Sequence, residues 1–194
     1  NQEIGNEDLS IAYYEKALEI EPENLRSKWL LMNTFPIIYK NFNQIDYFKK
    51  HFEKNLKLLE DLLSKNNIFK RKQILSALNS STNFYLHYNG DDITSLQKRY
   101  GVLLHNLTKY VYPQFHKKIL FNKSSQFIKV GFISPFFCKH VISKLFKNWI
   151  IKLNKDKFRT FVYYVGMRSD LITKLIKENC YSFFQKTDID DVIN

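Results

Sequence analysis

The sequence predicts an α plus α/β fold, in which a helical part is followed by a parallel sheet with crossover helices. Only five glycines and four prolines occur in 194 residues, which is too few turn residues for an all-β sandwich. Apolar residues recur at helical spacing up to about residue 118, and β-branched and aromatic runs begin after it. With 44% hydrophobic residues, the chain can build one large domain or two small ones.

The first predicted helix begins near Glu7 and is ended by Pro22. Its apolar side chains share one helical face, and the small Ala12 and Ala17 allow a neighbouring helix to approach closely. An aromatic pair, then Lys-Ala-Leu at 16–18, then Pro22 resembles the second helix and exit turn of a tetratricopeptide repeat. Residues 1–24 are therefore expected to be the end of such a repeat, which must stack on neighbouring helices.

Residues 25–121 are expected to form a helical connector. A buried helix is predicted over 25–39, closing near Pro36. A long amphipathic helix is predicted over 44–65, and its apolar stripe consists of Ile45, Phe48, Phe52, Leu56, Leu59 and Leu63.

The connector is expected to end with a turn and one more helix. The turn falls at Asn89-Gly90, and the helix is capped by Asp91 or Asp92 and stopped at Tyr112-Pro113. Three histidines of this part have no acid or cysteine at metal-ligand spacing, so we expect structural or surface roles for His87, His105 and His116.

The net charge of +11 is unevenly distributed. Residues 1–24 carry seven acids and one base, so the remaining 170 residues carry +17. Such a surface could attract nucleic acid, acidic lipid or phosphorylated ligands, but no arginine stripe occurs, and compositional bias towards lysine is the simpler interpretation. The densest cluster, Lys70-Arg71-Lys72, is interpreted as a helix surface, with a phosphate or partner contact as the alternative.

An α/β part is predicted over 122–194, after a polar linker at 122–125. Strands are predicted over 127–134, 158–166 and 181–184, with helices over 140–153 and 171–179 between them. Strands that alternate with helices at this spacing pair in parallel through right-handed crossovers, so we expect the first half of a Rossmann-like sheet.

The candidate site is the loop of residues 134–140, which follows the first strand. Ligands of open parallel sheets gather where strands end and helices begin. The loop lacks the glycine spacing of a dinucleotide fingerprint and the Gly-Lys-Ser/Thr of a P-loop, which argues against nicotinamide cofactors and P-loop ATP hydrolysis. His140 lies at the helix entrance, where its imidazole can contact a ligand, or simply cap or pack the helix.

Residues 129–140 (Lys-Val-Gly-Phe-Ile-Ser-Pro-Phe-Phe-Cys-Lys-His) and 158–164 (Phe-Arg-Thr-Phe-Val-Tyr-Tyr) add a family resemblance. Together with the half-repeat and the connector, they resemble the O-linked N-acetylglucosamine transferase family, the SPINDLY-like protein glycosyltransferases. The resemblance covers 6–24 and 126–186 well, and the connector less well. It implies that residues 122–194 are the truncated first βαβαβ portion of the N-terminal half of a GT-B catalytic region.

The resemblance also implies site residues and an activity. His140 matches the family's catalytic-pocket histidine, for which the resemblance leaves two roles open, general base and positioning of the donor or acceptor. Of these, positioning in the sugar-nucleotide pocket is the expected one. Ser134, Pro135 and Lys139 belong to the donor-pocket loop. Asp170 and Arg168 are candidate ribose or diphosphate contacts, with a helix cap and an exposed loop residue as the respective alternatives. The implied reaction is inverting transfer of N-acetylglucosamine, or a related sugar, from UDP-N-acetylglucosamine to protein Ser/Thr hydroxyls.

Neither a cofactor nor a metal is implied. The strand-end loops lack an Asp-x-Asp carboxylate pair, which occurs only in the acidic end at Asp188-Ile189-Asp190. The expected partners are the nucleotide-sugar donor and a protein acceptor held by the tetratricopeptide groove; no nucleic acid and no membrane span are expected. Two cysteines, Cys138 and Cys180, give no disulfide framework, and a cytoplasmic location is expected.

Two features depart from this expectation. Phe136 replaces the family's aspartate two residues after the serine, and Val141 replaces a small residue after the histidine. The phenyl ring of Phe136 cannot accept hydrogen bonds as a carboxylate does. This difference favours the rival interpretation, a non-enzymatic helical scaffold that binds partner proteins. A start without Met and the absence of a second α/β half also suggest a fragment that is inactive alone.

Overall fold

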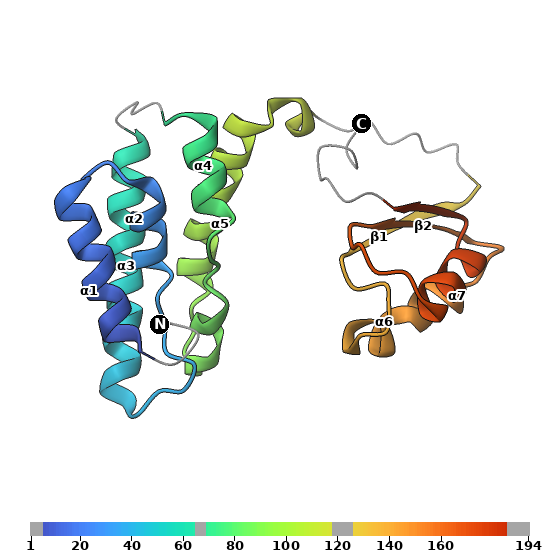
Figure 1. The fold of residues 1–194 in the computed structure, drawn as a ribbon, viewed down its shortest axis with the longest axis horizontal. Coiled ribbons are helices and arrows are strands. Elements are labelled where there is room, and N and C mark those ends of the chain that lie inside the picture. Colours follow the sequence, from blue (N-terminus) through green and yellow to red (C-terminus); the bar gives the residue numbers. More distant parts are fainter. Residues whose placement is uncertain (1–5, 65–68, 118–125, 186–194) are drawn as a thin grey trace. The chain divides into compact units, whose positions relative to one another are not determined.

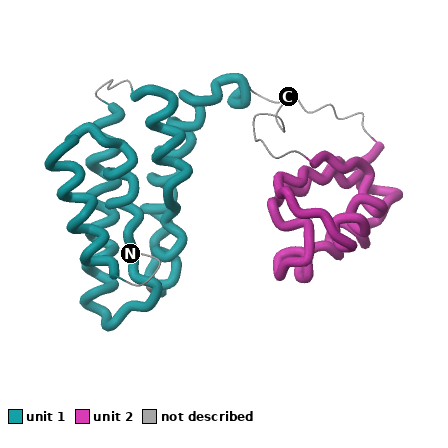
Figure 2. Tube along the Cα trace, in the orientation of Figure 1, with its two compact units in different colours: residues 1–118 teal, residues 119–194 magenta. Residues whose placement is uncertain are grey.

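The computed structural model describes residues 6–64, 69–117 and 126–185. The chain divides into two compact units, residues 1–118 and 119–194, and each has its own hydrophobic core (Figures 1 and 2). The predicted linker at 122–125 and the acidic end at 188–194 lie outside the described residues.

The first unit is helical, as the sequence predicts. Its described residues form α-helices that run up and down beside one another, α1 (Glu7–Ile20), α2 (Leu25–Met32), α3 (Phe42–Ser64), α4 (Arg71–Leu78) and α5 (Thr94–Val111) (Figure 1). The short 3-10 helices η2 (Phe84–Asn89) and η3 (Pro113–His116) flank α5. Asparagines open the first two α-helices, since the Asn24 side chain accepts from the backbone N–H of Ser27 at 2.9 Å and Asn6 caps α1 in the same way. Among the described residues, no helix combines the length and apolar character that a membrane crossing needs.

The core of the helical unit forms around α3. Phe48, Phe52, Leu56 and Leu59 of the predicted stripe are buried. Trp29 of α2 is fully buried against Tyr100 of α5, with ring centroids 5.6 Å apart, and its indole N–H donates to the carbonyl of Ser81 at 3.0 Å. The apolar residues that recur at helical spacing on separate helices therefore pack into one core.

Helix α2 is shorter than predicted, because it ends at Met32 instead of continuing towards Pro36. The side chain of Asn33 donates to the carbonyl of Trp29 at 3.0 Å, and the hydroxyl of Thr34 donates to the carbonyl of Leu30 at 2.8 Å. These two side chains pair with carbonyls of the last helical turn. In addition, Pro36 disfavours helical backbone at the residue before it. The buried segment 33–36 is therefore not helical.

The second unit is a three-stranded parallel sheet in the order β1-β2-β3, which confirms the Rossmann-like prediction. The strands are β1 (Ile128–Ser134), β2 (Phe158–Tyr164) and β3 (Ser182–Gln185), joined by α6 (Val141–Ile151) and α7 (Leu171–Asn179). The register aligns Ile128 with Phe158 and Phe161 with Ser182. Because neighbouring strands pair in parallel, their carboxyl ends lie at one edge of the sheet. Crossovers of one hand between sequential strands place both helices on one face.

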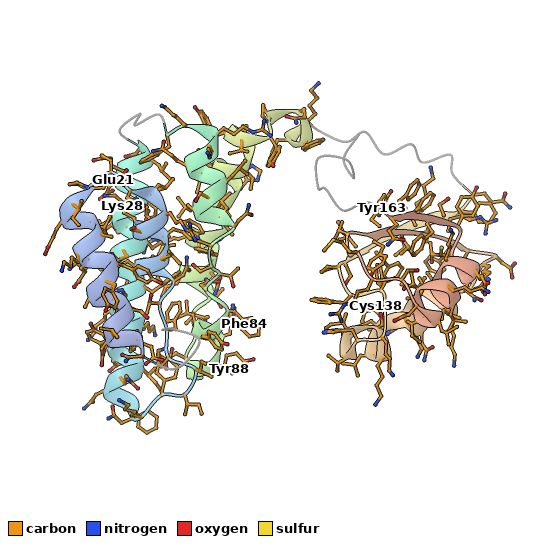
Figure 3. All side chains as sticks on the ribbon, viewed as in Figure 1. Glu21, Lys28, Phe84, Tyr88, Cys138 and Tyr163 are labelled. Carbon is orange, nitrogen blue, oxygen red and sulfur yellow. The ribbon has the colours of Figure 1, made fainter. Side chains whose placement is uncertain are left out.

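The two faces of the sheet differ. Val162 and Tyr164 of β2 are buried together with Ile150 of α6 and Ile176 of α7. On alternate positions, Tyr163 stacks on Phe184, with ring centroids 5.1 Å apart and planes 12° apart. Figure 3 shows Tyr163 on one side of the sheet and the buried Cys138 on the other.

Candidate functional site

The loop of residues 134–140 starts with a turn that Ser134 stabilises. The Ser134 hydroxyl accepts from the backbone N–H of Phe136 at 3.0 Å, and its carbonyl accepts from the N–H of Val165 at 3.2 Å. The chain therefore leaves β1 in a fixed direction, with Pro135 at the bend and His140 at the start of α6.

Two buried hydroxyls hold the middle of the loop. Ser143 of α6 donates to the carbonyl of Phe136 at 2.6 Å, and Thr173 of α7 donates to the carbonyl of Phe137 at 2.7 Å. Ser143 is 1% exposed and Thr173 is 3% exposed, so both bonds form away from water. Neither residue was singled out from the sequence, because a serine or threonine within a helix has no pattern that predicts its distant partner. The loop is thus fixed by both helices.

Asp170 links the loop to α7. One carboxylate oxygen accepts from the N–H of Ile172 at 2.9 Å and of Thr173 at 3.1 Å, and the other accepts from the N–H of Lys139 at 2.5 Å. The bond from Lys139 is the main reason why the pKa of Asp170 is lowered. The structure therefore shows the helix cap that was the alternative role of Asp170, and a ribose contact stays a prediction.

The loops after β1 and β2 pack closely at Gly166. A Cβ added there would lie 2.4 Å from the carbonyl oxygen of Pro135 and 2.5 Å from the Tyr164 ring, so only glycine fits. The Tyr164 hydroxyl donates to the carbonyl of Arg168, and burial raises the Tyr164 pKa to about 12. This fixes the backbone of Arg168, whose exposed side chain stays a predicted diphosphate contact.

His140 is the N-cap residue of α6. Its Nδ1 accepts from the backbone N–H of Ile142 at 3.2 Å, and the ring of Phe136 stacks on the imidazole with centroids 4.2 Å and planes 13° apart. An Nδ1 that accepts a hydrogen bond carries no proton, so neutral His140 carries its proton on Nε2. The Nε2–H is therefore the hydrogen-bond donor of the neutral ring, and the stacked ring of Phe136 supports the imidazole plane.

A cavity of about 500 Å³ lies beside this imidazole. Lys139, His140 and Ser143 line it together with Val141, Lys144, Lys147 and Ile172. Positions 140, 144 and 147 share one helical face, so helical periodicity could have identified Lys144 and Lys147 from the sequence. Among the predicted site residues, Lys139 and His140 line the cavity, whereas Ser134, Pro135 and Asp170 shape the loop behind it and Arg168 lies outside the lining.

The three histidines of the helical unit for which structural or surface roles were expected contact neighbouring side chains. The Nε2 of His87 lies 2.9 Å from the side-chain nitrogen of Gln97, and the ring centroids of His105 and His116 are 4.8 Å apart. Within the described ranges, no group of three or more metal-ligating side chains occurs.

Comparisons with known proteins add a likeness of fold. No family model matches the chain, and no curated protein matches it either. Among solved structures, a mutant O-GlcNAc transferase from Thermobaculum terrenum is similar, with 14% sequence identity and a TM-score of 0.49. The match covers 99% of this chain and 34% of that chain, so this chain spans about a third of its length. The identity and the TM-score are both too low to assign a function.

Proposed function

We propose that this chain forms part of a protein O-glycosyltransferase, contributing the end of a helical repeat region and the beginning of the N-terminal GT-B half. The proposed reaction transfers N-acetylglucosamine, or a related sugar, from UDP-N-acetylglucosamine to protein Ser or Thr hydroxyls. The observation that carries the proposal is the cationic cavity near the carboxyl end of β1, which Lys139, His140, Lys144 and Lys147 help to line. The sequence resemblance over 129–140 and 158–164 supports it.

The cavity has the charge that a nucleotide diphosphate requires. Lys139, Lys144 and Lys147 line it, and no acidic side chain is among its lining residues. The first turn of α6 adds backbone N–H groups at its positive end. Departure of the nucleotide increases the negative charge on the diphosphate, so donors fixed here before reaction would stabilise the transition state more than the bound sugar nucleotide.

His140 is proposed to position the donor instead of acting as a general base. A general base needs a free lone pair on the nitrogen facing the substrate, but Nδ1 accepts from Ile142 and Nε2 carries the proton. The Nε2–H can donate to a phosphate or sugar oxygen. Phe136, which stands where the family has an aspartate, fixes the ring plane by stacking.

The rival function is a helical scaffold that binds partner proteins without catalysis. The observation that favours it is Phe136, because its stacked ring brings no hydrogen-bonding group to the loop. The two functions differ in donor binding, since a scaffold has no reason to bind a sugar nucleotide.

The test is calorimetric titration of the purified chain with UDP-N-acetylglucosamine. We expect saturable binding that His140→Ala weakens about tenfold, because a hydrogen bond to a charged group is lost. His105→Ala, which removes a histidine of the helical unit, is expected to leave the affinity unchanged. The absence of binding, or equal effects of both substitutions, would contradict the proposal and favour the scaffold.

A sugar-transfer assay tests the expected dependence on a second half. GT-B chemistry takes place in a cleft between two α/β halves, so we expect the 194-residue chain to bind the donor without transferring sugar. Radiolabelled donor and acceptor protein would measure this. Turnover by this chain alone, at the rate of a complete enzyme, would contradict the expectation.

A further inference from the structure

The three side chains of the basic cluster Lys70-Arg71-Lys72 have different surroundings in the structure. The Arg71 guanidinium carbon lies 4.9 Å from the centroid of the Tyr112 ring, so this side chain contributes to packing at the start of α4. Lys70 and Lys72 instead line a cavity of about 340 Å³ in the helical unit, and Arg26 of α2 lines the same cavity. Three cationic side chains from two distant sequence segments therefore share one concave surface.

Little negative charge compensates these cations. The one acidic residue of the lining is Glu21, whose carboxylate accepts from the side-chain amide of Asn24 at 2.8 Å. Within residues 6–64, 69–117 and 126–185, Arg26, Lys70 and Lys72 form no ion pair. Glu21, labelled in Figure 3, lies at the end of the bundle where α2 and α4 begin. The positive helix ends add to the field of the side chains.

We propose that this cavity is a binding site for a phosphomonoester, separate from the strand-end cavity and independent of the function proposed above. The Arg26 guanidinium can donate two parallel hydrogen bonds to a phosphate, and Lys70 and Lys72 supply further charge. The volume lies within the range of about 300–1,000 Å³ for small-molecule sites, so it has room for more than a phosphate ion. The aliphatic stems of the cations provide apolar contacts for the organic group.

The test is an amide-resolved NMR titration of the 194-residue chain at constant ionic strength. The probes are inorganic phosphate and phenyl phosphate, with glutamate as the carboxylate control. We expect saturable shifts at residues 24–28 and 70–76, stronger binding of phenyl phosphate than of inorganic phosphate, and no saturable response to glutamate. Shifts at residues 139–147 would report the strand-end cavity, so the two sites are scored separately.

Variants test the charge arrangement in both directions. Arg26→Gln and Lys72→Gln are each expected to weaken phenyl phosphate binding about tenfold, because each loses a charged hydrogen bond. Glu21→Gln is expected to strengthen it up to about fivefold, because an exposed carboxylate is removed. The matched control is Lys57→Gln, which removes an exposed cation of α3 outside the cavity and should have no effect.

Three results would each overturn the proposal. They are the absence of saturable shifts at residues 24–28 and 70–76, equal weakening by Lys57→Gln, and a response to glutamate as strong as that to phenyl phosphate. The last result would identify a general anion surface.

Discussion

Replacing Thr173 by valine removes one hydroxyl from the centre of the α/β unit. Thr173 is 3% exposed, and its hydroxyl donates to the carbonyl of Phe137 and accepts from the N–H of Asp170. Leaving the Phe137 carbonyl unpaired costs about 1–3 kcal/mol, and loss of the Asp170 bond adds about 0.5–1.5 kcal/mol. Burial of the new methyl group returns about 0.8 kcal/mol. These contributions sum to about 0.7–3.7 kcal/mol, so we expect Thr173→Val to lower the free energy of unfolding of this unit by about 2 kcal/mol.

Native-state hydrogen exchange can locate this loss, because it measures opening free energies amide by amide. The opening free energy of the slowest amides of β2 should fall by about 2 kcal/mol, while that of the α3 amides stays unchanged. Thr173→Ser is the matched control, because it keeps the hydroxyl and loses one methyl group, worth about 0.8 kcal/mol. If Thr173→Val costs no more than Thr173→Ser, the hydroxyl does not hold the site loop and the reasoning is wrong.

Further predictions concern the loop contact, the helical core and pH. Gly166→Ala should destabilise the α/β unit by about 1–3 kcal/mol or more in urea unfolding, because its Cβ meets the Pro135 carbonyl; wild-type stability would show that the loops do not pack this closely. Leu56→Ala should cost the helical unit about 2–5 kcal/mol by hydrogen exchange of α3, since Leu56 is fully buried, and should spare β2. Because the pKa of Asp170 is lowered in the folded state, its bond to Lys139 should persist above the ordinary aspartate pKa and be lost as pH falls through the lowered value. The chemical shift of the Lys139 amide should change with a midpoint below pH 3.8, the ordinary pKa of aspartate. A midpoint at or above this pH would contradict the bond between Asp170 and Lys139.

The secondary structure could be predicted because its signals are local. The predicted apolar stripe from Phe48 to Leu59 is buried in the structure. After residue 126, strands alternate with helices as the β-branched and helical segments predict. The error at the end of α2 arose from Asn33 and Thr34, whose side chains bond to the last carbonyls of the helix. Apolar content alone does not show where such side chains end a helix.

The place of the loop in the fold was predictable, whereas its function as a site stays a prediction. The sequence placed His140 between a strand and a helix, where the structure has it as the N-cap of α6, and helical spacing would have added Lys144 and Lys147 to the lining of the adjacent cavity. The stacking of Phe136 on His140 was not predictable, because it depends on the loop conformation that Ser143 and Thr173 fix from two different helices. Sequence spacing carries no information about such long-range hydrogen bonds.

We propose that the cavity near the end of β1, which His140 helps to line, receives a sugar nucleotide. The most direct measurement is an amide-resolved NMR titration of the chain with UDP-N-acetylglucosamine. We expect saturable shifts concentrated at residues 139–147, together with a protonated Nε2 and an unprotonated Nδ1 on His140 in the long-range ¹H–¹⁵N spectrum. Shifts that avoid residues 139–147, or a His140 protonated on Nδ1, would contradict it.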